Sequence, residues 1–442
     1  MSLEFEIVIV GAGPAGLAAA CAAAESGSRV AILDDTPWLG GQIWRGQSSR
    51  PTLPEAQRWI QRFQKAGAVL LDRTAAIASP RPGLLLAEHE GSPRQIAYQR
   101  LILATGAREL FIPFPGWTLP GVVGPGGILS MTKTGWPVKG KRVVIAGSGP
   151  LLFATADSLR KSGATIVCIA EQAPSPSVTR FVLSLCGRPA KLRQAIALRF
   201  RQRAVPYHCG VWPIAAEGKE SVRSVKLTNG RDSWTETCDL FACGFGLEPN
   251  NELALALGCS LREGFVAVDD FQATSVPNVY CAGEPTGIGG ADCSLVEGQI
   301  AGYAAAGNTA TALALFSERD SWHRFRKSLA NAFKLRPELK SLAKDETLLC
   351  RCEDVSFGQV RRFNSWREAK LHSRCGMGAC QGRVCGAAAK FIFGWGMESV
   401  RPPILPARVG SLVTPAPVEP QRPAANMLAT VTPQGRFAAT KT

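Results

Sequence analysis

Five cysteines stand close together near the C-terminal end of the chain: Cys350, Cys352, Cys375, Cys380 and Cys385. The first two form a C-x-C pair and the last two a C-x4-C pair, which together supply the four thiolates that hold a [2Fe-2S] cluster. Cys375 lies between the pairs and could replace Cys385 as a ligand. The spacing therefore predicts a metal centre built from thiols.

Glycines surround the second pair, at Gly376, Gly378, Gly382 and Gly386. Without side chains there, backbone amides can approach the sulfurs and hydrogen-bond them, which raises the reduction potential of a cluster. Zinc also binds four thiolates and is the alternative, but its pairs usually have wider spacing than C-x-C. The pattern favours iron-sulfur over zinc, and a set of reduced, metal-free cysteines is the third interpretation.

The N-terminal stretch EIVIVGAGPAGLAAACAAAESGSRVAILDD predicts a buried strand, a glycine turn, a helix and a second strand. The turn is formed by Gly11, Gly13, Pro14, Ala15 and Gly16. Gly11 permits the tight turn, Gly13 lets the backbone approach a pyrophosphate, and Gly16 lets helix and strand pack closely. Asp34 ends the second strand, where a carboxylate accepts from a ribose hydroxyl. The stretch therefore predicts a dinucleotide-binding βαβ unit.

Two later stretches complete this pattern. LILATGAREL is a strand that ends at Thr105 and Gly106, and TSVPNVYCAGEPTG is a strand that ends at Gly283 and Glu284. In this order the motifs resemble the flavoprotein reductases with two dinucleotide-binding domains, in which such strands complete the FAD site. The resemblance implies FAD at the first turn. It places Glu284 where an aspartate usually meets the ribityl chain of the flavin.

A second βαβ unit, KRVVIAGSGPLLFATADSLRKSGATIVCIAEQ, repeats the first two glycines at Gly147 and Gly149. Leu152 stands at the position of the third glycine, so we expect helix and strand to approach less closely and the phosphate pocket to be altered or lost. Glu171 ends the second strand, where an adenosine ribose would be met, and an acid there favours NAD over NADP. Whether this unit binds NAD(P) stays open.

A redox disulfide beside the flavin is not expected. The stretch WLGGQIWRGQ, which contains Gly41 and Gln42, has no cysteine, and neither has GGILSMTKTGWPVKG. A thioredoxin-type or glutathione-type reductase needs a pair of thiols there to relay electrons. Electrons that leave the flavin must reach another acceptor, for which the C-terminal thiols are the candidates.

The resemblance narrows at CRCEDV and GMGACQGRVCG, with GGQIWR and GSGPLL as further matches. These stretches look like the α-type subunits of heteromeric amine dehydrogenases: opine oxidases, D-hydroxyproline dehydrogenases and the flavoprotein subunit of hydrogen cyanide synthase. The resemblance implies a cluster domain related to bacterioferritin-associated ferredoxin and cluster ligands at Cys350, Cys352, Cys380 and Cys385. It implies a partner, an FAD-containing amino acid oxidase-like subunit that oxidises the substrate, and allows an FMN between the subunits.

The expected architecture is α/β, with two Rossmann-like dinucleotide-binding domains, one inserted in the other, and a small C-terminal ferredoxin-like [2Fe-2S] domain. The 442 residues, 46% of them hydrophobic, suffice for two or three domains. The predicted ranges are an FAD domain at 1–115 and 240–305, an NAD(P)-binding-like domain at 116–239, a helical linker at 306–345, the cluster domain at 346–400 and an extended tail at 401–442.

Three functions are consistent with these motifs. The first is an electron-transfer subunit of a heteromeric amine or imino acid dehydrogenase, the second a stand-alone NAD(P)H-dependent reductase, and the third a scaffold that only holds nucleotide and cluster. Leu152 and the thiols favour the first. None of the four histidines lies in a motif that marks a general base, so no catalytic residue is predicted. The net charge of +15 comes without a nucleic-acid fold signature, and without a signal peptide or an apolar span we expect a cytoplasmic protein.

Overall fold

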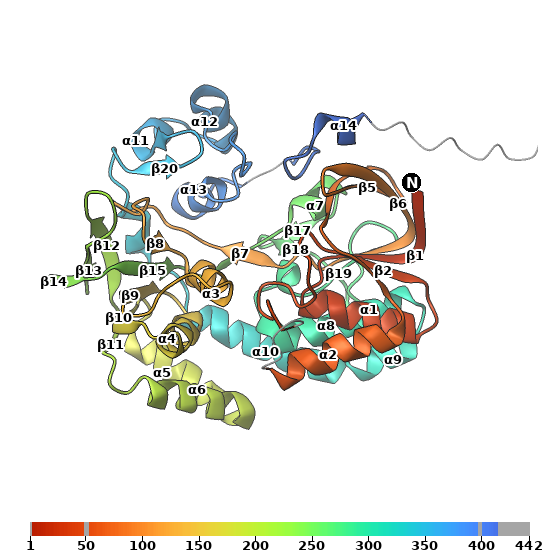
Figure 1. Ribbon diagram of the computed structural model, residues 1–442, viewed down its shortest axis with the longest axis horizontal. Helices are drawn as coiled ribbons and strands as arrows, with labels where there is room; N and C mark the ends of the chain where they lie inside the picture. Colours follow the sequence, from red (N-terminus) through yellow and green to blue (C-terminus); the bar gives the residue numbers. More distant parts are fainter. Residues whose placement is uncertain (1, 48–52, 397–399, 414–442) are drawn as a thin grey trace, which may run out of the picture.

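The computed structural model describes residues 2–47, 53–396 and 400–413. Figure 1 shows two α/β domains side by side and a smaller unit, containing α11 to α13, above them. The two larger domains confirm the predicted Rossmann-type architecture. None of the described helices is long and apolar enough to cross a membrane.

The first domain is built on a seven-stranded sheet of order β3-β2-β1-β6-β5-β4, in which β19 also pairs with β6. Its strands are β1 (Ser2–Val10), β2 (Val30–Leu33), β3 (Val69–Leu71), β4 (Thr74–Arg81), β5 (Leu84–His89), β6 (Ser92–Leu103) and β19 (Val279–Cys281). β1, β2, β3, β6 and β19 are parallel, and β4 and β5 add an antiparallel extension. The register aligns Val10 with Leu33 and Leu103, and Leu103 with Cys281. The residues that follow these strands therefore meet at one edge of the sheet.

Two helices made of small residues lie against each other beside this sheet. α1 (Pro14–Glu25) contacts α8 (Gly290–Ala305), and the backbones approach so closely that a Cβ on Gly298 would lie 2.2 Å from the Ala15 carbonyl oxygen. This contact brings the segment after β19 next to the turn after β1. The remaining helices of the domain are α2 (Pro54–Ala66), α7 (Glu252–Ala256), α9 (Thr309–Ala314) and α10 (Phe316–Ala332).

The second domain has a five-stranded sheet of order β11-β10-β9-β15-β8 and a separate antiparallel sheet β12-β13-β14. Its strands are β8 (Val122–Val123), β9 (Arg142–Gly147), β10 (Thr165–Glu171), β11 (Tyr207–Cys209), β12 (Trp212–Glu217), β13 (Ser224–Thr228), β14 (Ser233–Thr237) and β15 (Leu240–Gly244). Its helices are α3 (Pro125–Lys133), α4 (Leu151–Lys161), α5 (Ser175–Ser184), η1 (Leu185–Gly187) and α6 (Pro189–Arg201).

The structure corrects one predicted boundary. β15 pairs with β9 and β8, so residues 240–244 belong to the second sheet, whereas the sequence assigned them to the FAD domain. The chain crosses between the domains through a two-stranded ladder of β7 (Ala107–Glu109) and β16 (Leu247–Pro249). The short strands β17 (Leu261–Arg262) and β18 (Phe265–Val266) and the turn η2 (Glu284–Thr286) follow in the first domain.

The unit that carries the clustered cysteines follows α10 and the 3-10 helix η3 (Pro337–Ser341). Its elements are β20 (Leu348–Cys350), β21 (Val355–Ser356), α11 (Phe357–Val360), α12 (Trp366–Ser373) and α13 (Cys385–Phe393). A capping box between Ser356 and Gln359 starts α11, and the Ser365 hydroxyl accepts from Glu368 N at the start of α12. Its small core contains Leu349, Val360 and Trp366 together with cysteines, so the thiols are part of the packing.

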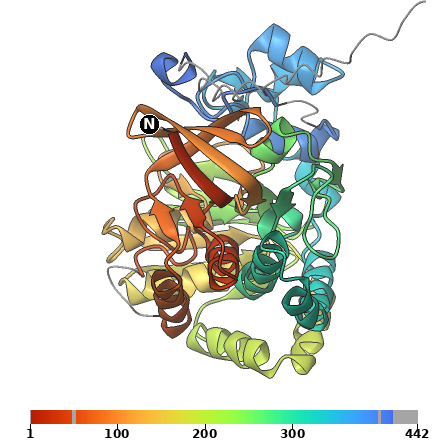
Figure 2. The ribbon, with the colours of Figure 1, turned by 90° about the vertical axis from the view of Figure 1, so that its right-hand side faces the viewer.

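Residues 401–413 do not extend away from the protein as predicted. Ile404 is buried in the core of the first domain and donates its N–H to the Ile77 carbonyl oxygen at 2.9 Å. Glu88 accepts from Arg408 N at 2.9 Å and from the Ser411 hydroxyl at 2.6 Å, next to α14 (Val409–Leu412). Figure 2 shows this segment and the cysteine-rich unit, both blue, on the same side of the first sheet. The rest of the predicted tail lies outside the described residues.

Candidate cofactor and metal sites

The first glycine turn leaves one of its three glycine positions open. Gly11 has φ 106°, and a Cβ there would lie 2.2 Å from the Ala104 carbonyl oxygen, while a Cβ on Gly16 would lie 1.8 Å from the Gly11 carbonyl oxygen. A Cβ on Gly13 would meet nothing within 4 Å. α1 begins at Pro14 without a side-chain cap, so its first-turn amides face this space. The arrangement suits a diphosphate at the helix N-terminus.

Asp34 lies beside this turn, at the carboxyl end of β2. Its Oδ2 accepts from Ala12 N at 2.7 Å, and its Oδ1 accepts from Thr36 N at 2.9 Å and from the Thr36 hydroxyl at 2.6 Å. The carboxylate is thereby held in one orientation while the residue stays half-buried. This is the position at which a dinucleotide presents its ribose hydroxyls.

The loop that contains Gly41 and Gln42 folds back over the turn. Gly40 N donates to the Ala12 carbonyl oxygen at 2.8 Å, and a Cβ on Gly41 would lie 2.9 Å from the Gly13 Cα. Gly41 must therefore be a glycine for the loop to approach the turn. Gln42 Oε1 accepts from Arg45 Nε at 3.1 Å, on the side of the loop that faces α3.

Thr105 and Gly106 follow β6 at the same edge of the sheet. The Thr105 hydroxyl donates to the Asn250 carbonyl oxygen at 2.7 Å, and Asn250 Nδ2 donates to the Thr105 carbonyl oxygen at 2.9 Å. Gly106 has φ 68°, and a Cβ on it would meet nothing within 4 Å. Asn250, which no motif marked, thus fixes the shape of the predicted ATG turn.

Gly283 and Glu284 follow β19 and face α1. Gly283 has φ 82°, and a Cβ there would lie 2.8 Å from the Cβ of Ala15. Glu284 Oε1 accepts from Gly290 N at 2.9 Å, whereas its buried Oε2 has no hydrogen-bond partner among the described residues. Burial raises the pKa of the Glu284 carboxyl to about 7. An unpartnered carboxylate oxygen at this position fits a ligand that carries hydroxyl groups, as the ribityl chain of FAD does.

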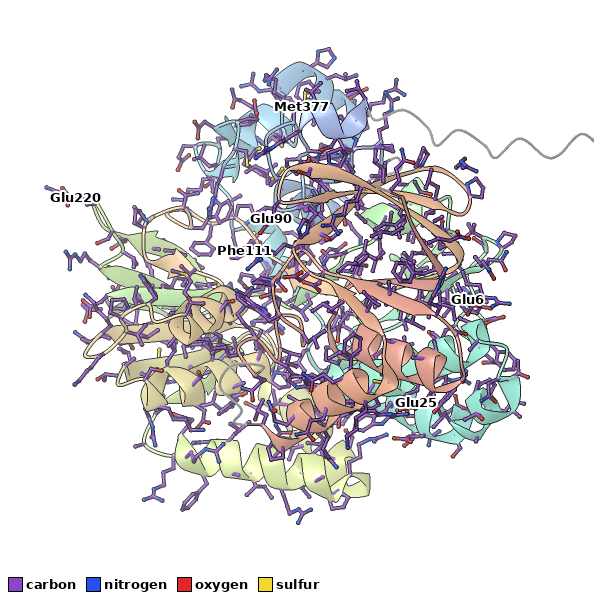
Figure 3. All side chains as sticks on the ribbon, turned by 45° about the vertical axis from the view of Figure 1, so that its right-hand side comes forward. Glu6, Glu25, Glu90, Phe111, Glu220 and Met377 are labelled. Atoms are coloured by element: carbon purple, nitrogen blue, oxygen red, sulfur yellow. The ribbon has the colours of Figure 1, made fainter. Side chains whose placement is uncertain are left out.

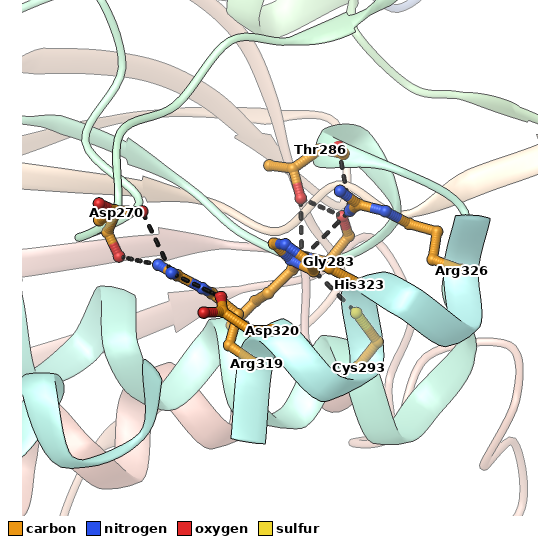
Figure 4. A network of polar contacts seen from close by, with 9 residues as sticks. Asp270, Gly283, Thr286, Cys293, Arg319, Asp320, His323 and Arg326 are labelled. Atoms are coloured by element: carbon orange, nitrogen blue, oxygen red, sulfur yellow. Dashed lines mark hydrogen bonds and ion pairs between the residues drawn. The ribbon is translucent and has the colours of Figure 1, made fainter. Parts of the chain in front are cut away.

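A buried carboxylate holds the Gly283 turn in place from below, as Figure 4 shows. Glu297 of α8 is 1% exposed, and its Oε2 accepts from Gly283 N and from the Thr286 hydroxyl, both at 2.9 Å. Its Oε1 contacts His323 Nε2 at 2.8 Å and Arg326 Nη1 at 3.2 Å, both from α10. The carboxylate is therefore satisfied by backbone, hydroxyl and charged partners, and it ties α10 to the candidate FAD site.

Cys293 is the other group with metal-ligand chemistry in this network. Its thiol lies 3.5 Å from Glu297 Oε1, the same oxygen that pairs with Arg326. Burial raises the pKa of the Cys293 thiol well above its ordinary value. Because the guanidinium already neutralises the carboxylate, this cluster is a polar brace in the structure rather than a cation site.

The second glycine turn keeps the strand end but not the helix contact of the first. A Cβ on Gly147 would lie 1.7 Å from the Gly244 carbonyl oxygen, and a Cβ on Gly149 would meet nothing within 4 Å. Leu152, at the third position, is 1% exposed and packs in the core with Val143 and Ile145 of β9. The side chain that replaced the third glycine is thus part of the hydrophobic core.

Glu171 does not lie where a ribose could reach it, contrary to the prediction from the sequence. The residue is 1% exposed, and its two oxygens accept from Gly149 N at 2.7 Å and Ala173 N at 2.8 Å. Burial raises the pKa of the Glu171 carboxyl to about 7. The carboxylate therefore joins the turn to the end of β10 within the protein.

The segment after α10 passes beside this second turn. The Ser148 hydroxyl donates to the Phe333 carbonyl oxygen at 3.2 Å. Gln172 Nε2 donates to the Ser148 hydroxyl at 2.9 Å and to the Lys334 carbonyl oxygen at 3.3 Å, and Gln172 Oε1 accepts from Arg336 N at 3.2 Å. Polar groups around the second turn are thus bound by the chain itself.

The five cysteines meet at one end of the small unit. The sulfurs of Cys350, Cys375 and Cys385 are buried and lie within 4.8 Å of one another. Cys352 is exposed and Cys380 partly buried, and the thiols of these two contact each other. Cys375 therefore has the position of a ligand as well as Cys385, the alternative that the spacing left open. A metal ion or cluster between these thiols would displace their protons.

Backbone amides reach the sulfurs, as the glycine pattern predicted. The thiol of Cys385 and burial raise the pKa of Cys350, while the amides of Gly376 and Glu353 lower it by donating to the sulfur. A Cβ on Gly378 would lie 2.3 Å from the Cβ of Cys352, so this position requires glycine. Figure 3 shows Met377, just before Gly378, at the outer end of the unit. One side of the thiol group thus faces solvent and the other faces the core.

The chain belongs to the pyridine nucleotide-disulphide oxidoreductase family, which it matches over residues 5–310. Membership defines an oxidoreductase and implies FAD, in agreement with the open first turn. Among named proteins it is similar to the A-type subunit of opine oxidase from Agrobacterium tumefaciens, with 31% identity over 95% of this chain and 90% of that protein. It is also similar to hydrogen cyanide synthase subunit HcnB of Pseudomonas protegens, with 28% identity over 86% of this chain and 89% of that protein. These relatives confirm the resemblance predicted from the cysteine and glycine motifs.

Solved structures show the same fold. The crystal structure of L-proline dehydrogenase from P. horikoshii matches with a TM-score of 0.70 and 20% identity, over 93% of this chain and 80% of that chain. Thioredoxin reductase from T. acidophilum matches with a TM-score of 0.54 and 24% identity, over 71% of this chain and 98% of that chain. The first match extends over nearly the whole chain, including the part beyond the two dinucleotide domains.

Proposed function

We propose that this chain is the electron-transferring flavin and iron-sulfur subunit of a heteromeric dehydrogenase that oxidises the C–N bond of an amine or imino acid. The substrate would be an opine, D-hydroxyproline or glycine-type compound, oxidised in an FAD-containing amino acid oxidase-like partner, with an FMN between the two proteins as a further carrier. The names of the relatives support an oligomer of different chains, because both are subunits.

One observation carries the proposal: a site suited to FAD and a group of five thiols occur in one chain, in units that contact each other. When bound, FAD supplies two-electron and one-electron chemistry and a [2Fe-2S] cluster one-electron chemistry. The protein's own part is to bind, to orient and to shield. Gly13 and the start of α1 would accept the diphosphate, Asp34 the ribose and Glu284 the ribityl hydroxyls.

For the cluster we propose Cys350, Cys352, Cys380 and Cys385 as ligands. Cys350 and Cys385 would form the buried side and Cys352 and Cys380 the side nearer solvent. Cys375 contacts the buried pair and is the competitor for Cys385. The iron content of Cys375→Ser and Cys385→Ser, each purified without air, separates the two choices. We expect full iron in the first variant and loss of iron in the second, and the opposite pattern would assign Cys375 as the ligand.

The contacts around the second glycine turn weigh against a stand-alone NAD(P)H reductase. Glu171 is buried, Leu152 fills the core, and the segment 333–336 binds Ser148 and Gln172. A dinucleotide at this turn would have to compete with these internal hydrogen bonds. We therefore expect NADH to reduce the isolated chain slowly.

Co-expression with an amino acid oxidase-like flavoprotein tests the function. We expect a stable complex that reduces a dye when an opine, D-hydroxyproline or glycine is added, and no such activity from this chain alone. Cys380→Ser should stop dye reduction while the partner's flavin is still reduced by substrate. Cys186→Ser is the matched control, because Cys186 is exposed and lies outside the thiol group. Rapid reduction of the isolated chain by NADH would overturn the proposal in favour of the reductase.

A further inference from the structure

The loop between Cys380 and Cys385 is fastened to the first domain through one arginine. The Arg383 guanidinium lies 3.7 Å from Glu252 Oε1 and donates to the Ile404 carbonyl oxygen. The Arg383 carbonyl oxygen accepts from Arg108 Nε at 3.0 Å. The loop that carries two of the clustered thiols is therefore attached to the first domain by both its backbone and a side chain.

Arg108 connects this attachment to the candidate FAD site. Its Nη1 lies 2.8 Å from Glu252 Oε1 and donates to Asn250 Oδ1 at 2.7 Å. Asn250 in turn is hydrogen-bonded in both directions to Thr105, which begins the ATG turn. A continuous set of polar contacts thus runs from the turn at the end of β6 to the thiol loop.

The charges in this contact are buried and unequal in number. The side chains of Arg108, Glu252 and Arg383 are 18%, 10% and 19% exposed, so a single carboxylate lies between two guanidinium groups. Removing the carboxylate would leave two like charges facing each other away from water, which is far more costly than losing a surface ion pair. The interface between the two units depends on Glu252 for this reason.

We propose that Glu252 is a positioning residue for electron transfer: with Arg108 and Arg383 it holds the thiol loop at a fixed place on the FAD-binding domain. This inference rests on the proposed function, in which electrons pass one at a time between FAD and a [2Fe-2S] cluster, so that one group is oxidised by one electron as the other is reduced. Small changes in the placement of reacting groups change such rates strongly. Glu252 touches neither group and acts through the two arginines.

The test compares Glu252→Gln with Arg361→Met in the full chain. Arg361 pairs with Asp345 at 2.7 Å in the same small unit, but both side chains are more than half exposed, at 53% and 61%, so this variant is a matched control. FAD and iron content should be unchanged in both. After flash photoreduction of the flavin, cluster reduction should slow by about tenfold or more in Glu252→Gln and stay unchanged in Arg361→Met.

Hydrogen exchange supplies a readout that is independent of the cofactors. The amides of residues 380–385 should exchange faster in Glu252→Gln than in the unaltered chain or in Arg361→Met. Arg383→Lys, which keeps the charge, should fall between them. Unchanged transfer and unchanged exchange in Glu252→Gln would overturn the positioning role. A chain without FAD or iron would refute the proposed function instead, and the exchange measurement would still decide whether Glu252 fastens the loop.

Discussion

The two glycine turns of this chain are alike at the strand and unlike at the helix. In both, the first glycine packs against a neighbouring carbonyl oxygen, at Ala104 in one and Gly244 in the other. In the first turn Gly16 lets α1 approach the strand end, whereas in the second Leu152 packs in the core. The comparison shows that a βαβ unit can keep its fold after its ligand contacts have been used for internal packing.

The carboxylates after the second strands show the same difference. Asp34 is half-buried beside an open turn, while Glu171 is fully buried and bound to its own backbone. The segment 333–336 then binds Ser148 and Gln172 next to the second turn. The first domain thus presents a ligand site and the second acts as a support for the linker to the cysteine-rich unit.

Giving the first turn the residue found in the second should have the largest effect. In Gly16→Leu the new Cβ would lie 1.8 Å from the Gly11 carbonyl oxygen, a backbone atom that cannot move away cheaply. We expect a loss of stability of more than about 4 kcal/mol and no bound FAD, seen as low soluble yield and a missing flavin spectrum. A folded variant with full FAD would show that the close packing is not required.

Truncating the side chain in the second turn should cost less and leave the flavin in place. Leu152→Ala should lower the free energy of unfolding by about 3 kcal/mol, because it creates a cavity in a closed core. Leu151→Ala, one position earlier on α4 and only partly buried, is the control and should cost less. Chemical denaturation measures both. A gain of tight NADH binding in Leu152→Ala would contradict the supporting role of this domain.

The middle glycines should separate binding from folding. Gly13 has φ −72° and open space around it, so Gly13→Val should fold normally and weaken FAD binding by about 1–3 kcal/mol. Gly149 has φ 98°, so Gly149→Ala should cost about 1 kcal/mol of stability through backbone strain and leave FAD binding unchanged. Flavin titration and denaturation of the two variants give the four values. Equal FAD affinity in both would remove the distinction between the turns.

The smallest expected effect is a difference in pH dependence. Burial raises the pKa of Glu171 and of Glu284 from 4.5 to about 7, so the folded chain binds more protons than the unfolded chain between these values. The free energy of unfolding should therefore fall as the pH rises from 4.5 to 7. Bound FAD should weaken the part due to Glu284, because a hydroxyl that donates to the carboxylate favours its ionised form.

Glu284→Gln should then flatten the pH dependence only in the FAD-free chain, and Glu171→Gln should flatten it with and without FAD. Denaturation at several pH values, with and without FAD, makes the comparison. If Glu284→Gln has the same effect in both states, the flavin does not meet this carboxylate.

The sequence was sufficient where parallel strands and local turns determine the site. Gly11, Asp34, Thr105 and Gly283 each follow a predicted strand, and parallel strands bring their carboxyl ends to one edge. β15 was assigned to the other domain because a short apolar strand fits either sheet, and only its pairing with β9 decides. Residues 401–413 were taken for an extended tail because their composition gives little sign of a core, whereas Ile404 is buried.

The residues that sequence reasoning missed act over long distances along the chain. Glu297 is an acidic residue inside an apolar helix, which is a recognisable signal of a buried network, but His323 and Arg326 come from a separate helix. The Arg108, Glu252 and Arg383 contact joins three distant segments. Spacing rules cannot find such partners, since they describe neighbours on one element.

Counting the bound groups in the chain purified without air tests the central claim most directly. If the first turn alone holds a dinucleotide and the thiols hold a [2Fe-2S] cluster, each chain should contain about one FAD, about two irons and about two sulfides, and no nicotinamide nucleotide. About one zinc per chain without inorganic sulfide, or a second dinucleotide bound as firmly as the first, would contradict it.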